Sequence, residues 1–275
     1  MPTVLTIAGF DPSSGAGITA DLMVFAAHGL FGTSAITALT VQSTLGVRAT
    51  HPVSAEILRE TLSCLEADLR PAGIKIGMLA NAANVAAVGD YLETQPGDFP
   101  VVLDPVLRST SGRELLDPEG FTTLRERLLR LVGWITPNLD ELAALTHRKG
   151  LTRDDLPNAC RELQAQVTDR KTASRLGIFA TGGHLDPPDD FLLTPTGDEI
   201  WLPGKHISTR ATHGTGCALS SAFLSRLVLG DSPCEAARAA KRYLTTALQF
   251  ALERGAGHSS VNHLWQLTKA NTLDI

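Results

Sequence analysis

The chain has 275 residues, of which 43% are hydrophobic and 19% are charged, and its formal net charge at pH 7 is −5. This length is typical of one large α/β domain, and the apolar content is enough for a sizeable core. Acidic and basic residues are interspersed without a run of like charge, which argues against nucleic acid or an anionic membrane as the main partner. We therefore expect a single domain over residues 1–275.

The amino-terminal and cysteine patterns indicate a cytoplasmic protein. The first five residues lack the basic start and long apolar run of a signal peptide, and no apolar stretch reaches the roughly 18 residues that span a bilayer. The four cysteines, at positions 64, 160, 217 and 234, form no close pair and show no metal-ligand spacing with histidine. Free thiols in a reducing compartment are therefore expected rather than disulfides or zinc.

Apolar strand-like runs alternate with amphipathic helical runs, which predicts a mainly parallel sheet covered by helices on both faces. In chain order, the pattern predicts strands at 3–8, 33–40, 74–78, 101–104, 134–136 and 176–180. Between these strands it predicts helices at 18–28, 55–67, 82–92, 121–131 and 140–146. A hairpin of strands at 191–193 and 199–202 is expected next, and then helices at 218–229, at 233–252 and after residue 260. Residues 168–174 and 186–190 are expected to form loops.

The polar and glycine-rich segments of the chain collect where the predicted strands end. They lie at 9–17, 42–44, 77–78, 104–106, 137–141 and 181–184. In an open parallel sheet, ligands bind at the carboxyl ends of the strands. We therefore expect one shared site at this edge of the sheet.

The most informative of the motifs is the segment 212–217, which runs directly into an apolar helix of small residues. Gly214 and Gly216 let the backbone bend closely around a ligand, and the helix that starts there offers unpaired N–H groups. Such a corner suits a phosphate or a developing negative charge. The Cys217 thiol in the first helical turn is biased toward thiolate, and so toward acting as a base or nucleophile. A plain turn with a buried cysteine is an equally good interpretation of this segment alone.

The loop at 15–17 follows the first predicted strand and matches a dinucleotide-binding fingerprint. A Rossmann site also needs an acidic residue at the end of the second strand, where this chain has Gln42. A small polar substrate is therefore the better ligand for this loop. Asp21, on the following helix, either complements the helix dipole or faces that ligand together with Gln42. A carboxylate and an amide would match a nitrogen heterocycle that carries an amino group.

Two acidic residues, Asp104 and Glu141, stand at a predicted strand end and a predicted helix start. Each could be a cap or a solvated charge, and together they could hold Mg²⁺, directly or through water. Asn138 is a good N-cap for the helix that carries Glu141, and it could also reach a nucleotide phosphate. The residues alone leave both interpretations open.

Together and in this order, these segments resemble the hydroxymethylpyrimidine and phosphomethylpyrimidine kinases of the ribokinase-like superfamily. The matching pieces lie at 8–13, 15–18 with 20–21, 37–39 with 42, 75–79, 102–106, 135–139 with 141, 182–184, 213–217 and 240–241. The resemblance implies a three-layer α/β/α sandwich with a mainly parallel central sheet. It also implies transfer of the γ-phosphoryl group of ATP, with Mg²⁺, to a substrate hydroxymethyl group in thiamine biosynthesis. Relatives of this kind are commonly dimers, so a homodimer is expected.

On the substrate side, the resemblance implies that Asp21 and Gln42 bind the aminopyrimidine in a pocket lined by Gly9, Met78 and Val106. The alternative within the same superfamily is a pyridoxal kinase, whose substrate is also a small aromatic heterocycle with a hydroxymethyl group. The pair of Asp21 and Gln42 favours the aminopyrimidine, because it can satisfy both an exocyclic amine and a ring nitrogen. Pyridoxal has no amine to place there.

For the chemistry, the resemblance implies that Gly214, Thr215, Gly216 and Cys217 form the anion hole. A primary alcohol is a poor nucleophile, so a nearby base that takes its proton late in the reaction helps. Our hypothesis is that Cys217 is this base. A helix N-terminus lowers the pKa of a thiol, which predicts a partly ionised Cys217 near neutral pH.

On the nucleotide side, the resemblance implies that Asp104 and Glu141 handle Mg²⁺, while Asn138, Lys241 and Thr181 lie toward ATP. At position 181 the family usually carries lysine, so that this chain lacks one positive charge near the phosphates. Either Lys241 compensates for that charge, or turnover is weak. Thr181 also supports an alternative of another class, a sensor that binds the pyrimidine without phosphorylating it, which the retention of Cys217, Asp104 and Glu141 opposes.

Two further departures from the family pattern concern loops. Ser14 stands where a glycine is common, which predicts reduced backbone freedom in the first loop. The segment 255–263 keeps the sequence Val-Asn-His at its end but lacks the usual Gly-Pro before it.

Overall fold

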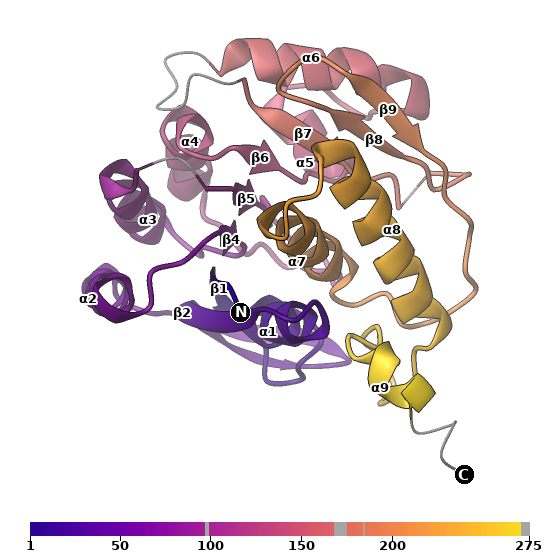
Figure 1. Ribbon diagram of the computed structural model, residues 1–275, viewed down its shortest axis with the longest axis horizontal. Helices are drawn as coiled ribbons and strands as arrows, with labels where there is room; N and C mark the ends of the chain where they lie inside the picture. The colour runs from indigo at the N-terminus through magenta and orange to yellow at the C-terminus, as the bar shows by residue number, and fades with distance from the viewer. Residues whose placement is uncertain (97–98, 168–174, 184, 271–275) are drawn as a thin grey trace.

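The computed structural model describes residues 1–96, 99–167, 175–183 and 185–270 (Figure 1). In these residues nine strands form one sheet, in the order β3-β2-β1-β4-β5-β6-β7-β8-β9. The strands are β1 (Thr3–Phe10), β2 (Phe31–Ser43), β3 (Gly46–Pro52), β4 (Ile74–Ile76), β5 (Val101–Leu103), β6 (Trp134–Ile135), β7 (Gly177–Ala180), β8 (Asp190–Leu193) and β9 (Glu199–Leu202). Neighbours from β2 to β7 pair in parallel, whereas β3, β8 and β9 pair antiparallel.

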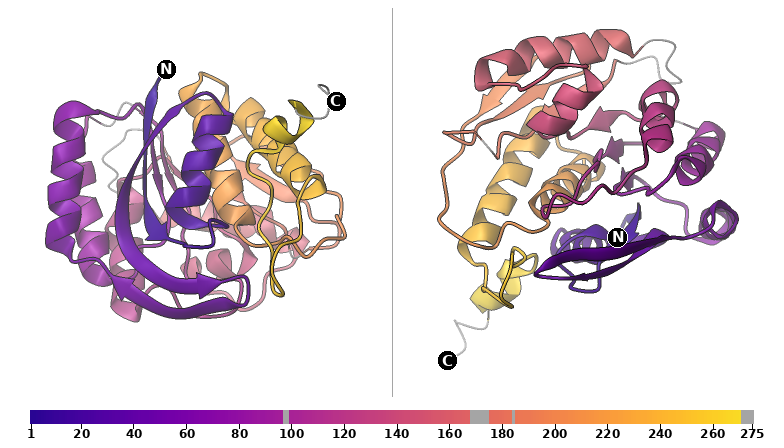
Figure 2. Two further views of the ribbon diagram at one scale, coloured as in Figure 1. Left: turned by 90° about the horizontal axis from the view of Figure 1, so that it is seen from below. Right: turned by 180° about the vertical axis from the view of Figure 1, so that it is seen from behind.

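Helices cover both faces of this sheet (Figures 1 and 2). The helices are α1 (Gly17–Ala27), α2 (Ala55–Asp68), α3 (Ala82–Thr94), α4 (Pro118–Glu126), α5 (Leu139–Leu145), α6 (Leu156–Gln166), α7 (Thr215–Val228), α8 (Pro233–Gln249) and α9 (Trp265–Ala270). Apolar residues of α2 to α6 join one buried cluster, and those of α1, α7 and α8 join another on the opposite face. The three-layer α/β/α sandwich with a mainly parallel central sheet is thus confirmed.

Local sequence explains where several of these helices begin. Five of them start after a residue whose side-chain oxygen accepts a hydrogen bond from a backbone N–H in the first turn, namely Ser54, Asn81, Asp117, Asn138 and Ser232. Such a cap satisfies one of the N–H groups that a helix start leaves without a partner, and it contributes about 1 kcal/mol.

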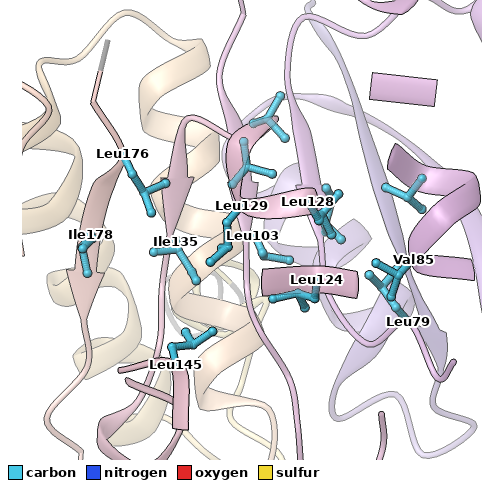
Figure 3. Packing of buried hydrophobic residues seen from close by; sticks show 14 of the residues in the cluster. Leu79, Val85, Leu103, Leu124, Leu128, Leu129, Ile135, Leu145, Leu176 and Ile178 are labelled. Atoms are coloured by element: carbon cyan, nitrogen blue, oxygen red, sulfur yellow. The ribbon is translucent and has the colours of Figure 1, made fainter. Parts of the chain in front are cut away.

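The alternation of side chains along each strand divides the core between the two faces. On β4, Ile74 and Ile76 point into the cluster under α2 to α6, whereas Lys75 between them points to the α1 and α7 face. Figure 3 shows the first cluster, in which Leu103 of β5 packs near Leu124 and neighbouring leucines. None of the helices in the described ranges combines the length and apolar character needed to cross a bilayer.

The structure extends the predicted elements in three places. The edge strand β3 and the helix α6 were not predicted. In place of the helix expected at 121–131, the structure has α4, which begins at Pro118, and then a short 3₁₀ turn at Leu128–Arg130. Most side chains of β3 are partly or fully exposed, so the strand lacks the apolar run on which the prediction depended. The predicted loop at 168–174 lies outside the described residues.

Candidate functional site

A small cavity of about 160 Å³ opens at the carboxyl edge of the sheet, as the placement of the polar segments predicted. Its lining includes most of the expected site residues: Gly9, Gln42, Met78, Asp104, Val106, Glu141, Gly214, Thr215, Gly216 and Cys217. It also includes residues to which the sequence analysis gave no role, among them Asp11, Lys75, Arg108, Ser109, Thr110 and His213. Four expected residues lie elsewhere: Asp21, Asn138, Thr181 and Lys241.

The corner at the start of α7 has the geometry of an anion-binding site. Gly214 adopts a left-handed backbone (φ +78°), and a Cβ there would lie 1.8 Å from the carbonyl oxygen of Gly15, so only glycine fits. The first backbone bond within the helix runs from the N–H of Ala218 to the oxygen of Gly214, at 2.9 Å. The three N–H groups before it, including that of Gly216, therefore have no partner within the helix and remain available for an anion.

Asp21 is not in the cavity, which corrects its expected contact with a substrate. The residue is fully buried between the sheet and α7, and one carboxylate oxygen accepts a hydrogen bond from Ser221 at 2.7 Å. The other accepts from Thr6 at 2.6 Å and from the Lys75 ammonium at 3.0 Å. Asp21 also lies beyond the first turn of α1, so the helix-dipole interpretation does not apply either. Its position on the sheet side of α1 turns the carboxylate inward rather than toward the strand ends.

Lys75 takes the place beside the cavity that was expected for Asp21. Its ammonium is fully buried, lines the cavity and lies 3.9 Å from a carboxylate oxygen of Asp104. Burial is the largest single influence and lowers the pKa of Lys75, but the charges of Asp21 and Asp104 and the hydrogen bond to Asp21 act together against it and hold the pKa above its usual range. The sequence carried a signal for this residue, because a lysine between two isoleucines in a buried strand must find a charged partner.

The carboxyl groups of Asp104 and Glu141 face the same cavity and influence one another. Burial is the largest cause that raises the pKa of Glu141 to about 8, the charge of Asp104 adds to it, and a hydrogen bond from the Asn138 N–H opposes it. Burial also raises the pKa of Asp104, whereas the ammonium of Lys75 lowers it. In the described part of the chain, no three His, Cys, Asp or Glu side chains gather closely enough to hold a metal ion. These two groups thus offer oxygen donors of the kind that Mg²⁺ prefers, but an incomplete coordination shell.

The surroundings of Cys217 oppose ionisation of its thiol, contrary to the expectation from its place at a helix start. Burial raises the pKa of the thiol to about 12; the Lys75 ammonium lowers it, and the carboxylates of Asp104 and Asp21 raise it further. The backbone N–H of Gly17 donates toward the sulfur but does not offset the burial. Loss of hydration therefore dominates over the helix dipole at this thiol.

The residues expected to face the nucleotide lie along the sheet edge beyond the cavity. Asn138 and Glu141 form a reciprocal cap at the start of α5, with both N···O distances at 2.9 Å. Next to it, the N–H of Thr181 donates to the carbonyl oxygen of Pro137 at 2.9 Å. The side chain of Asn138 thus has the capping role that its sequence position allowed.

Lys241 is tied to the turn after β7 through Asp190. One carboxylate oxygen of Asp190 accepts from the Gly182 N–H at 2.9 Å, and the other accepts from the Lys241 ammonium at 2.6 Å. Lys241 also lines a separate hollow of about 390 Å³, together with Arg238 and Arg242. The lysine is therefore close to the turn that carries Thr181, but Asp190 balances its charge.

A chain of three polar side chains crosses the wall of the cavity that faces β2. The Nε2 atom of His213 lies 2.7 Å from a carboxylate oxygen of Asp11 and 3.0 Å from the amide of Gln42. Asp11 also accepts hydrogen bonds from backbone N–H groups of the glycine loop, at 2.8 Å from Ser13 and 2.9 Å from Ala16. Burial raises the pKa of Asp11, but the hydrogen bonds from His213 and Ser13 outweigh it, so that the pKa lies below its usual value.

Comparison with known proteins gives consistent results over nearly the whole chain. Residues 11–262 match the model of a family described as phosphomethylpyrimidine kinase. A hydroxymethylpyrimidine/phosphomethylpyrimidine kinase of Rhizobium meliloti (strain 1021) is 42% identical over 262 residues, which cover 94% of this chain and 96% of that protein. The crystal structure of phosphomethylpyrimidine kinase from Clostridium difficile 630 matches with a TM-score of 0.76 and 35% identity, over 90% of this chain and all of that one. The pyridoxal kinase of Staphylococcus aureus in complex with pyridoxal matches with a TM-score of 0.84 and 25% identity, over 96% and 94% of the two chains.

Proposed function

Because the chain belongs to the phosphomethylpyrimidine kinase family, we propose that it phosphorylates 4-amino-5-hydroxymethyl-2-methylpyrimidine and its monophosphate with ATP, in thiamine biosynthesis. The observation that carries the proposal is the meeting of an anion-binding helix corner, two carboxyl groups and an amide around one small cavity. Phosphoryl transfer needs little covalent chemistry from a protein, but it needs alignment and stabilisation of negative charge. This arrangement provides both.

The acceptor substrate would lie in the part of the cavity next to β2. Gln42 supplies a polar group there, and Met78 and Val106 supply apolar walls for an aromatic ring. A Cβ on Gly9 would lie 2.9 Å from the Met78 sulfur, so glycine at this position lets the thioether close the wall. The hydroxymethyl group would then point toward the start of α7.

The phosphoryl group would lie at the α7 corner, with its oxygens on the N–H groups of Thr215, Gly216 and Cys217. Asp104 and Glu141 would hold Mg²⁺, directly or through water, and the ion would supply charge neutralisation to the phosphates. The remainder of ATP would extend along the sheet edge, where Asn138, Thr181 and Lys241 succeed one another. The three cationic side chains of the second hollow, Arg238, Lys241 and Arg242, support this direction.

We retain Cys217 as the base that takes the proton of the hydroxymethyl group. Because its pKa is raised, the sulfur must release its own proton as it accepts the new one. Asp104, to which the thiol is hydrogen-bonded, is the acceptor within reach. The alcohol oxygen then attacks the phosphorus, and ADP leaves.

A Cys217→Ala variant tests this role of the thiol. A general base contributes about 10²–10⁴-fold to a rate, so the variant should lose at least a hundredfold in kcat while the pyrimidine still binds. Cys64→Ala, which removes an exposed thiol on α2, is the matched control and should leave kcat unchanged. Full activity of Cys217→Ala would exclude the thiol as the base.

A pyridoxal kinase is the second candidate, and two observations favour it. The structural match to the pyridoxal-bound Staphylococcus aureus enzyme is close. Moreover, the buried Asp21 cannot offer its carboxylate to an exocyclic amine, which removes half of the argument for an aminopyrimidine. The preference for the pyrimidine therefore depends on Gln42 and on the family.

The deciding experiment follows ATP consumption with Mg²⁺ and each of three acceptors by phosphorus NMR: the hydroxymethylpyrimidine, its monophosphate and pyridoxal. Conversion of both pyrimidines to the diphosphate would support the proposal, and turnover of pyridoxal alone would move the assignment to the second candidate. Binding of the pyrimidine without turnover would mean that the protein is a sensor and that threonine at position 181 does not sustain catalysis.

We also propose that residues 1–275 form one kinase domain, which acts in the cytoplasm as a homodimer. Leu39 and Val41 on β2 are each 47% exposed beside the edge strand β3, and a second copy would cover this apolar surface. Light scattering after gel filtration should give twice the chain mass of 29.2 kDa. A charge in the surface, as in Val41→Asp, should then convert the dimer to a monomer.

A further inference from the structure

Asp11, His213 and Gln42 form a row of hydrogen-bonded side chains, and the positions of their hydrogen atoms determine which end of the Gln42 amide faces the cavity. The Nε2 atom of His213 is 2.7 Å from a carboxylate oxygen of Asp11. A carboxylate only accepts hydrogen bonds, so the Nε2 atom must carry a hydrogen. A ring nitrogen that carries a hydrogen cannot accept another one from an amide N–H. The structure has the Gln42 amide nitrogen at this contact, 3.0 Å from the ring, but two donors cannot share it. The amide must therefore be turned over, so that its oxygen accepts from the same N–H as Asp11 in a three-centre bond.

Thr40 gives an independent test of the same amide orientation. Its hydroxyl oxygen is 3.0 Å from the carbonyl oxygen of Phe10 and 3.2 Å from the other end of the Gln42 amide. The single hydroxyl hydrogen is donated to the carbonyl, which can only accept. The hydroxyl oxygen can then accept from the amide NH₂ of the turned Gln42 side chain. His213 thus requires the oxygen on its own side of the amide, and Thr40 accommodates the nitrogen on the other.

This orientation leaves one polar hydrogen of Gln42 for a ligand. The amide NH₂ has two hydrogens, and Thr40 takes one of them. Gln42 lines the cavity, so the second N–H is available to whatever binds there. An amide that was free to rotate could instead present its oxygen and accept from a ligand.

The imidazole that sets this orientation is itself held firmly. The His213 side chain is 13% exposed, and a Cβ on Gly15 would lie 2.2 Å from its ring, so the glycine loop packs directly against it. The backbone N–H of His213 donates to the carbonyl oxygen of Ser259 at 3.1 Å. A ring held in this way keeps its Nε2–H directed at Asp11 and at Gln42, so that the Gln42 oxygen stays on the His213 side.

We propose that His213, held by Asp11, is a positioning residue that makes Gln42 a hydrogen-bond donor toward the substrate. The site therefore selects a heteroaromatic ring with an unprotonated nitrogen where Gln42 reaches it, and it discriminates against a ring with C–H at that position. This inference rests on the proposed function of the site, and it identifies the chemical feature by which the acceptor is chosen.

The experiment measures dissociation constants by calorimetry, without ATP, for the pyrimidine and for its two analogues in which one ring nitrogen is replaced by C–H. A polar group left without a partner in a buried site costs about 1–3 kcal/mol, so the wild type should bind at least one analogue about 10- to 100-fold more weakly than the pyrimidine. In His213→Phe, which keeps a flat ring, that ratio should fall below about threefold. His213→Gln, whose amide N–H can still donate, should keep a larger ratio than His213→Phe.

A double-mutant cycle separates positioning from a general structural role. If His213 acts through Gln42, then His213→Phe should lower the affinity for the pyrimidine in the wild-type background and have no further effect in Gln42→Met. Equal losses in both backgrounds would overturn the proposal. His206→Phe, at an exposed histidine outside the cavity, is the matched control and should leave the ratio unchanged. Thermal unfolding of each variant confirms that it is folded before its binding is measured.

The outcomes distinguish this inference from the proposed function. A wild type that binds and phosphorylates the pyrimidine but does not discriminate against either analogue would overturn the inference and leave the proposed function intact. A wild type that binds no pyrimidine would overturn both.

Discussion

The two faces of the sheet are built by the same alternation of side chains, yet they bury different chemistry. The face under α2 to α6 is packed with leucine, isoleucine and valine (Figure 3). On the other face, the middle of β1 and β4 carries Thr6 and Lys75, which meet Asp21 of α1. A substitution in an apolar cluster removes only some of its contacts. Removal of one member of a buried ion pair leaves the other charge buried without a partner. The apolar face thus tolerates gradual change, whereas the ion pair buried on the other face does not.

The largest effect is expected from Lys75→Met, which leaves Asp21 with a buried charge. Breaking a buried ion pair by removing one partner costs about 3–5 kcal/mol, so urea unfolding should show a loss near 4 kcal/mol. The double variant Lys75→Met/Asp21→Asn removes both charges and should recover part of that loss. If the single variant is as stable as the wild type, the buried ion pair is no more sensitive to substitution than the apolar face.

A somewhat smaller effect is expected from Leu128→Ala on the apolar face. Leu128 is fully buried and lies outside the cavity lining. Removal of a buried leucine side chain costs about 2–4 kcal/mol through lost transfer energy and a cavity. The KM for the pyrimidine should stay within about twofold of the wild type, because this face stabilises the fold without contacting substrate. A large rise in KM would show that the two faces are coupled.

A third effect depends on pH and comes from Glu141. Its pKa is about 8 in the folded protein against an ordinary 4.5, so in this range the folded state holds a proton that the unfolded state has released. Stability from this group is therefore fully present below pH 4.5 and is lost as the pH rises toward 8. Without divalent cations, the wild type should lose about 1–3 kcal/mol between pH 5 and 8 relative to Glu141→Gln. Parallel stability curves for the two proteins would contradict the raised pKa.

The smallest effect is expected from Ser14→Gly in the loop beside the cavity. Ser14 adopts φ +58°, the left-handed region, as its replacement of a family glycine suggested. A side chain in this region costs about 1 kcal/mol of stability, which glycine would relieve. Part of this gain is offset, because glycine gives the unfolded chain more conformational freedom. The variant should be about 0.5 kcal/mol more stable by urea unfolding. A destabilised variant would mean that the serine hydroxyl supports the loop.

The sequence predicted the layers and the location of the site because both depend on local patterns. Strand-forming runs followed by glycine or polar residues placed the cavity at the correct edge, and Gly214 predicted the sharp turn at which α7 begins. The helix α6 was missed although Leu156, Ala159, Cys160 and Leu163 have helical spacing and are buried. This spacing is typical of an amphipathic helix.

The contacts within the site could not be predicted, because they join residues that are distant in sequence. Which way Asp21 faces depends on Lys75 and on Ser221, and no property of α1 alone reveals either partner. The raised pKa of Cys217 likewise comes from loss of hydration and from the carboxylates of Asp104 and Asp21, which are distant in sequence and outweigh the helix start visible there. His213 was part of a recognised motif, but its partners Asp11 and Gln42 belong to two other loops.

The late position of α7 in the chain has a consequence for synthesis. Ser221, which completes the hydrogen bonds of Asp21, is made 200 residues after it. At ribosomal rates of 5–20 residues per second, roughly 10–40 s pass between the two. During this time the nascent strands β1, β4 and β5 can cover their leucine-rich face with α2 and α3, while Lys75 and Asp21 lie on the other face, beside apolar residues such as Val4 and Val102, without the cover of α7. The buried charges beside the site therefore gain their last hydrogen bond only when α7 closes that face.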